Sequence, residues 1–258
     1  MTTSNTMSNT TSHSTGPRLF VDQALHPGAE LAASPAQAHY LGTVLRQAAG
    51  AKLRLFNGRD GEYLARLTAI RRDRASFAVA ECLRPQAPEP DVWLAFAPLK
   101  RDATDLVVQK ATELGVAVIL PVFTERTNTA RLNLDRLRAI ATEAAEQSER
   151  LTVPRMADPQ RLVEMLAQWP AGRPLAVALE RLDAPPLHPA AGPAGLLVGP
   201  EGGFAPAEVE RLRRHADVAI ISLGPRILRA ETAAIVGLAL LQATPVWPAP
   251  LLQPARGG

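Results

Sequence analysis

Hydrophobic and polar residues alternate over short stretches in the first third of the chain. KLRLFNG at 52–58, EYLARLTAI at 62–70 and ASFAVAECL at 75–83 show this two-residue period, which is typical of strands that bury one face. A helix is expected at 34–47, where Ser34 can cap the first turn and Pro35 takes the first helical position. Residues 18–84 are therefore predicted to form a small β-rich domain with one helix.

The pattern changes after the segment 84–91, which has three prolines in eight residues. Prolines interrupt regular structure, so a domain boundary is expected there. Beyond it, strands are expected at 92–99, 116–123, 174–180, 195–199 and 218–224, and helices at 101–114, 135–150, 159–168, 206–215 and 231–242. This alternation predicts an α/β domain over 91–243, with a mainly parallel sheet covered by helices on both faces.

Composition limits the environment of the chain. Of its 258 residues, 47% are hydrophobic, and the longest apolar stretch, around 233–241, is about half the roughly 20 residues that a membrane helix requires. No membrane span is expected. Residues 1–17, rich in Ser, Thr and Asn, are predicted to be a disordered tail, and the Pro-rich residues 244–258 an irregular one. The single cysteine, Cys82, excludes an internal disulfide, and without an export signal the chain is expected in the cytoplasm.

Arginine makes up most of the 28 basic residues, although the formal net charge is only +3. The guanidinium group is suited to phosphates and bases, so a polyanionic partner is one interpretation. The other is that these arginines solvate helix faces, and composition alone favours it.

Two glycine-containing loops carry the candidate chemistry. Gly199 and Pro200 follow one apolar run, Gly224 and Pro225 follow the next, 25 positions later, and each loop leads into a predicted helix. In a parallel sheet, the loops after the strands gather at one edge, where such folds bind ligands. The two loops are predicted to face one crevice.

The residues of the first loop indicate the kind of ligand. Glycines let the backbone approach a ligand closely, and Glu201 stands where a phosphate-binding loop has lysine, which argues against a nucleoside triphosphate. A neutral or cationic ligand fits better. Nearby apolar residues can form a slot for a flat ring such as adenine, although each also fits a buried strand. They are Leu196, Leu197, Val198, Ile221, Leu223, Ile227 and Leu228.

The second loop, SLGPRILRAET, adds charged residues at the start of the last predicted helix. Amides at a helix start, with an arginine nearby, can stabilise negative charge that develops on a substrate, and Arg229 is the candidate for this role. Glu231 also fits a residue that only complements the helix dipole, and Arg226 fits a solvated side chain.

LLVGPEGGF and LGPRILRAETA together resemble the paired signature of the ribosomal RNA small subunit methyltransferase E family, which belongs to the SPOUT class of trefoil-knotted methyltransferases. Further similar motifs follow the same order: HYLGTVLR and LFNGRDGEY in the first domain, then KATELGV, TERT, and EAAEQSER followed by VP. The resemblance covers residues 18–242, and so many ordered motifs rarely match by chance.

The resemblance implies a PUA-like RNA-binding barrel at 18–84 and a knotted SPOUT methyltransferase domain at 91–243. It implies methyl transfer from S-adenosylmethionine to ring nitrogen 3 of a specific uridine in 16S ribosomal RNA, by a homodimer acting on the assembled small subunit. No metal is required, because the sulfonium already activates the methyl group. Two alternatives stay open: a SPOUT enzyme that acts on tRNA or on a ribose 2′-oxygen, and a noncatalytic RNA-binding assembly factor.

The resemblance also assigns roles to residues. Arg229 would stabilise the charge on the uridine, and Glu231 or water would remove the proton. The cofactor-binding candidates are Leu179, Glu180, Val198, Gly199, Pro200, Glu201, Gly203, Leu223, Gly224, Ile227, Leu228 and Thr232. The RNA-binding candidates, each of which also fits a solvated surface, are Arg46, Arg54, Arg59, Arg66, Arg71, Arg72 and Arg74. Thr104 and Leu106 depart from the Met and aromatic residue common in the family, and are expected to affect packing rather than activity.

Overall fold

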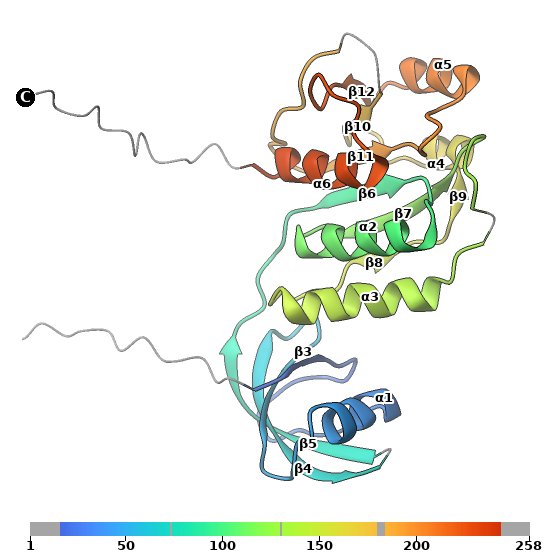
Figure 1. Cartoon of the computed structure of the whole chain (residues 1–258). Coiled ribbons are helices and arrows are strands. Elements are labelled where there is room, and N and C mark those ends of the chain that lie inside the picture. Colours follow the sequence, from blue (N-terminus) through green and yellow to red (C-terminus); the bar gives the residue numbers. More distant parts are fainter. Residues whose placement is uncertain (1–15, 73, 130, 180–183, 244–258) are drawn as a thin grey trace, which may run out of the picture. The chain divides into compact units, whose positions relative to one another are not determined.

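The computed structural model describes residues 16–72, 74–129, 131–179 and 184–243 (Figure 1). It divides into two units, Met1–Ala87 and Pro88–Gly258, at a point inside the proline-rich segment 84–91. Residues 1–15 of the tail expected at 1–17, and the whole of the segment 244–258 expected to be irregular, lie outside the described residues. Pro17 belongs to the folded unit, since its carbonyl accepts a hydrogen bond from the Arg54 amide at 2.9 Å.

The first unit is a five-stranded sheet in the order β1-β3-β4-β5-β2. Its strands are β1 (Arg18–Phe20), β2 (Glu30–Ala32), β3 (Lys52–Phe56), β4 (Glu62–Arg71) and β5 (Arg74–Arg84). Leu53 and Leu55 of β3, and Phe77 and Val79 of β5, alternate into its hydrophobic core, which confirms the two-residue period of these strands. In β4 the period holds for Ala65 and Leu67, and beyond them Ala69 is exposed where the pairing with β5 shifts register. The three-residue strands β1 and β2 were not predicted.

The helix expected at 34–47 is shorter and changes type. Its start is confirmed: the Gln37 amide donates to the Ser34 hydroxyl at 3.2 Å, and the Ser34 amide donates to the Gln37 side chain at 2.9 Å. The α-helix α1 (Pro35–His39) then continues as a π-helix, η1 (Tyr40–Val44). Leu41 of the π-helix is buried, and Val44 is 59% exposed. A helix was therefore predicted correctly at this place, but it ends before residue 47, and the wider turns of its second half were not predicted.

The second unit contains a seven-stranded parallel sheet in the order β12-β10-β11-β6-β7-β8, with β9 paired to β7. The strands are β6 (Val92–Phe96), β7 (Val118–Phe123), β8 (Arg155–Met156), β9 (Gln160–Arg161), β10 (Leu175–Ala178), β11 (Ala194–Val198) and β12 (Val218–Ile221). The helices are α2 (Arg101–Glu113), α3 (Leu134–Gln147), α4 (Leu162–Ala167), α5 (Pro206–Arg214) and α6 (Ala230–Leu241).

Helices cover both faces of this sheet, as the strand pattern predicts. One hydrophobic cluster packs residues of α2, α3 and α6 on the face that holds Leu196 of β11. A second cluster packs residues of α4 and α5 on the face that holds the neighbouring Leu197. Side chains that follow each other along a strand point to opposite faces, so a strand buried on both is a continuous apolar run.

Strand β10 lies between β11 and β12 in the sheet. Ala178, the last residue of β10, is in register with Val198 and Ile221, the last residues of the other two strands. The segments that leave these three strands therefore begin side by side at one edge. No described helix is both long enough and apolar enough to cross a membrane.

Candidate functional site

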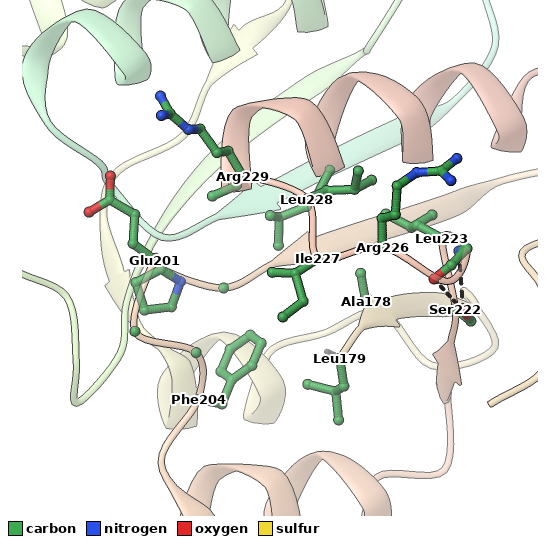
Figure 2. Close-up of a pocket in the computed structure, with 18 of the residues that line it drawn as sticks. Ala178, Leu179, Glu201, Phe204, Ser222, Leu223, Arg226, Ile227, Leu228 and Arg229 are labelled. Carbon is green, nitrogen blue, oxygen red and sulfur yellow. Dashed lines mark hydrogen bonds between the residues drawn. The ribbon is translucent and has the colours of Figure 1, made fainter. Parts of the chain in front are cut away.

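A pocket of about 1070 Å³ lies where β10, β11 and β12 end (Figure 2). We call residues 199–205, after β11, the first loop, and residues 222–229, after β12, the second loop. Both loops line the pocket, together with residues of α5 and the start of α6. The two glycine loops thus share one crevice, as their positions after parallel strands predict.

The first loop owes its shape to its glycines and to Phe204. The Gly203 amide closes a turn onto the Pro200 carbonyl at 2.8 Å, and Gly203 has a φ of 66°, in the left-handed region that favours glycine. A Cβ on Gly199 would lie 2.7 Å from the Phe204 ring. The ring therefore packs directly on the glycine backbone, and a larger residue at 199 would displace it.

The second loop is more exposed. Gly224 has a φ of 115°, and its amide donates to the Ser222 hydroxyl at 3.2 Å. Residues 224–227 are exposed, and Ile227 keeps 60% of its surface open. Figure 2 shows Ile227 extending from this loop toward Phe204 and Leu179. A large apolar side chain exposed inside a concave site is suited to contact a ligand.

Charged side chains surround this apolar part of the pocket. Arg229 occupies the N-cap position of α6, where its carbonyl accepts a hydrogen bond from the Ala233 amide at 2.8 Å. In Figure 2, Arg229 and Glu201 extend on one side of the pocket and Arg226 on the other. Arg229 thus lies at the electropositive start of a helix. Within the described ranges, no three His, Cys, Asp or Glu side chains gather as metal ligands would.

Most of the predicted cofactor residues line the pocket. Those that do are Leu179, Val198, Gly199, Pro200, Glu201, Gly203, Leu223, Gly224, Ile227 and Leu228. Thr232 and Glu231 lie in the first turn of α6, outside the lining, and Glu180 falls outside the described residues. Leu196, Leu197 and Ile221 are buried in the sheet core, as the strand interpretation allows.

Several lining residues were missed in the sequence. They are Ala178, Phe204, Val209, Arg213, Ser222, Ala230 and Ala233. Gly202 and Pro225 of the two predicted loops also line the pocket, as does Arg226, for which a solvated role was weighed against a functional one. A signal existed for two of the missed residues: Val209 and Arg213 are four residues apart in a predicted helix, and such residues share one helix face.

The arginines predicted to bind RNA fall into two groups. Arg46, Arg66, Arg71, Arg72 and Arg74 are exposed. The side chain of Arg54 is only 15% exposed and lies 3.9 Å from buried Glu62, which also pairs with Arg18 and Arg84. Arg59 is exposed but donates to the Asp22 carbonyl at 2.6 Å. Arg54 and Arg59 therefore have structural contacts within the first unit.

Part of the LFNGRDGEY motif also has a structural explanation. The Asn57 side-chain oxygen accepts hydrogen bonds from the amides of Arg59 and Asp60, which forms the turn. Asp60 in turn accepts from the Leu25 amide at 2.8 Å and from the Asn57 amide group at 2.6 Å. The Leu25 bond first, and then the Asn57 bond, lower the pKa of Asp60 below its usual value.

Comparisons with known proteins cover both units. The model of an RNA methyltransferase PUA domain matches residues 34–79, and that of an RNA methyltransferase domain matches residues 86–242. The ribosomal RNA small subunit methyltransferase E of Rickettsia conorii is 35% identical over 227 residues, covering 86% of this chain and 93% of the relative. The chain belongs to the ribosomal RNA small subunit methyltransferase E family.

The fold of the chain also matches solved structures of methyltransferases. The structure of the Neisseria gonorrhoeae methyltransferase E bound to S-adenosyl methionine matches with a TM-score of 0.79 and 30% identity, over 87% of this chain and 95% of that one. A Legionella pneumophila methyltransferase in complex with SAM matches with a TM-score of 0.76 and 30% identity, over 88% and 96%. The predicted family, and an α/β methyltransferase domain after a PUA-like domain, are confirmed. The trefoil knot stays a prediction.

Proposed function

We propose that the protein transfers a methyl group from S-adenosylmethionine to ring nitrogen 3 of one specific uridine in 16S ribosomal RNA. As a member of the methyltransferase E family, it is an S-adenosylmethionine-dependent ribosomal RNA methyltransferase. The observation that carries the finer proposal is the position of Arg229, which lines the pocket at the start of α6.

The pocket lining fits S-adenosylmethionine, which combines a flat adenine with a positively charged sulfonium. Leu179, Phe204 and Ile227 offer an apolar surface to the ring. Glu201 offers a carboxylate to a cationic ligand. The backbone is also accessible, because a Cβ added to Gly203 or Gly224 would meet nothing within 4 Å. When bound, the cofactor supplies a methyl group that its sulfonium has already activated.

The residues around the pocket suit the chemistry of uridine. Nitrogen 3 becomes nucleophilic when its proton leaves, and negative charge then spreads over the two flanking carbonyl oxygens. We assign the stabilisation of this charge to the Arg229 guanidinium, helped by the amides at the start of α6. Proton removal is assigned to Glu231 or to water; Glu231 lies half-buried in the first turn of α6.

The proposed partners follow from exposed groups. Arg46, Arg71, Arg72 and Arg74 are exposed cations that can neutralise RNA phosphates. Leu106 of α2 and Leu240 of α6 are exposed apolar side chains on two helices that contact each other, and we propose that a homodimer covers them. We propose that the dimer acts on the assembled small subunit, and hence in the cytoplasm.

Two measurements test this function. Calorimetry should show that the folded protein binds S-adenosylhomocysteine, and a folded protein that binds neither this product nor S-adenosylmethionine would contradict the cofactor assignment. Mass mapping of nucleosides should then show one N3-methylated uridine in 16S ribosomal RNA that disappears from cells without the protein. A change in tRNA or at a ribose 2′-oxygen would overturn the target, and no change in any RNA would favour an assembly factor.

A further inference from the structure

The TERT sequence at 124–127 forms a tight turn directly after β7. The Thr127 amide donates to the Thr124 carbonyl at 3.2 Å, and the Thr124 amide donates to the Thr127 hydroxyl at 2.9 Å. The two hydroxyls are also 2.9 Å apart. These bonds close the turn and leave Glu125 and Arg126 exposed at its tip.

Two hydrogen bonds join this turn to the first loop and the helix that follows it. Arg126 Nη1 donates to the Gly202 carbonyl at 2.9 Å. The Glu125 amide donates to Glu208 Oε1 at 2.8 Å, and the Ala205 amide donates to Glu208 Oε2 at 2.9 Å. One carboxylate of α5 thus holds both the TERT turn and the last residue of the first loop.

The carbon stem of Arg126 also packs near the loop. A Cβ added to Gly202 would lie 3.7 Å from both Cβ and Cδ of Arg126, an ordinary van der Waals distance. Arg126 and Glu208 do not belong to the residues that line the pocket, whereas Gly199, Gly202 and Phe204 do. Any effect of the two charged residues on a ligand therefore passes through the conformation of the first loop.

We propose that Arg126 and Glu208 are positioning residues that hold the first loop in its binding conformation, so that the TERT turn sets the affinity for the cofactor. The proposal deepens the cofactor site described above and rests on it. Ordering a flexible backbone on binding costs conformational entropy for every residue that becomes fixed. A loop that is fixed in the free protein avoids part of that cost, so its ligand binds more tightly.

Another glutamate in the chain can test whether Glu208 acts only by capping its helix. Glu164 occupies the same position in α4, where its Oε2 accepts a hydrogen bond from the Arg161 amide at 3.1 Å. Like Glu208, it caps a helix from outside the pocket lining, but its carboxylate accepts from the Arg161 amide and not from the first loop or the TERT turn. Arg211, exposed on α5, is the control for the loss of an arginine.

The experiment compares Arg126→Ala, Arg126→Lys and Glu208→Ala with the controls Glu164→Ala and Arg211→Ala in the full chain. Calorimetry measures the affinity for S-adenosylhomocysteine, and hydrogen exchange measures the amides of residues 200–205 in the ligand-free protein. We expect Arg126→Ala and Glu208→Ala to weaken binding about tenfold and to speed exchange in the loop. Arg126→Lys, which keeps a positively charged donor group, should have an affinity between those of Arg126→Ala and the unchanged protein. In turnover assays, the KM for S-adenosylmethionine should rise while kcat stays the same.

Binding and loop exchange that stay unchanged in Arg126→Ala would overturn the proposal. So would an equal loss of affinity in Glu164→Ala, because capping alone would then explain Glu208. If Glu208→Ala does not fold, the affinities and loop exchange of Arg126→Ala and Arg126→Lys test the proposal. If the unchanged protein binds no S-adenosylhomocysteine, the proposed function fails instead, and faster loop exchange in ligand-free Arg126→Ala still supports the role of Arg126 in holding the first loop.

Discussion

The two loops of the pocket are held in different ways. Two hydrogen bonds from outside hold the first loop, one from Arg126 to the Gly202 carbonyl and one from the Ala205 amide to Glu208. Within the loop, the Phe204 ring packs on Gly199. The second loop is exposed over residues 224–227 and carries Arg226 and Arg229. One wall of the pocket is thus fixed before a ligand arrives, while the other presents charged groups to solvent.

This difference suggests a division of work between the loops. A fixed wall suits a small cofactor that must bind in one orientation, because little ordering is left to be done on binding. An exposed loop with arginines suits a large anionic substrate that approaches from solvent. Loss of an arginine from the second loop should therefore mainly affect methyl transfer, whereas changes to the backbone or packing of either loop should affect cofactor affinity or stability.

The largest effect is expected for Arg229→Ala in the second loop. Removing a group that stabilises developing charge costs about 10²- to 10³-fold in rate, so methyl transfer measured under single-turnover conditions should fall at least about a hundredfold. The affinity for S-adenosylhomocysteine should stay within about twofold, because the first loop is unchanged. Arg226→Ala, in the same loop, serves as the control and should have a smaller effect. Full activity of Arg229→Ala would show that the catalytic assignment is wrong.

A smaller effect is expected when glycines of the two loops are compared. Gly224→Ala forces a side chain onto a φ of 115°, whereas Gly202 has no left-handed φ and its added Cβ would lie 3.7 Å from Arg126. Backbone strain of this kind costs about 1–3 kcal/mol, so Gly224→Ala should weaken S-adenosylhomocysteine binding about tenfold in calorimetry. Gly202→Ala should change it less than about threefold. Equal losses would mean that both loops adapt to the ligand in the same way.

Gly199→Ala should reduce stability rather than chemistry. Its Cβ would lie 2.7 Å from the Phe204 ring, and overpacking of this kind costs about 1–3 kcal/mol. For domains of this size, each 1 kcal/mol lowers Tm by roughly 2–4 °C, which calorimetric melting can resolve. Combining Gly199→Ala with Phe204→Leu should restore part of the lost stability. A Tm within about 1 °C of the unchanged protein would show that the first loop is less firmly packed than its contacts indicate.

The smallest effect is expected for Glu231→Gln. Because Glu231 lies outside the pocket lining, we expect it to complement the α6 dipole, a contribution of about 0.3–1 kcal/mol for an acidic side chain at a helix start. The single-turnover rate should then change less than about threefold, which leaves water as the proton acceptor. A loss of a hundredfold or more, with unchanged cofactor binding, would instead identify Glu231 as the general base.

Elements that carry a local signal were predictable from the sequence. Apolar runs mark β11 and β12, and Ser34 with Pro35 marks the start of α1. The two-residue strands β8 and β9 are too short to show any period. The π-helix was missed because its residues have the same helical character as α1 before it, and only the packed structure shows the wider turn.

The candidate site was predictable where it follows directly from strand ends, as at Gly199 and Gly224. Its supports were not. Arg126 meets Gly202 across 76 positions of the chain, and Glu125 meets Glu208 across 83. Nothing in the local pattern of TERT reveals these partners, so its function could be argued only from the three-dimensional contacts.

Because β10 lies between β11 and β12, the pocket can form only after all three strands have been synthesised. The residues that line the pocket extend from Ala178 to Ala233, so a growing chain that stops before α6 lacks one wall of the site. Contacts between distant segments form late, because a long loop must close first. Cofactor binding would therefore distinguish finished molecules from incomplete ones, and an enzyme truncated near its end would be unable to engage the methyl donor.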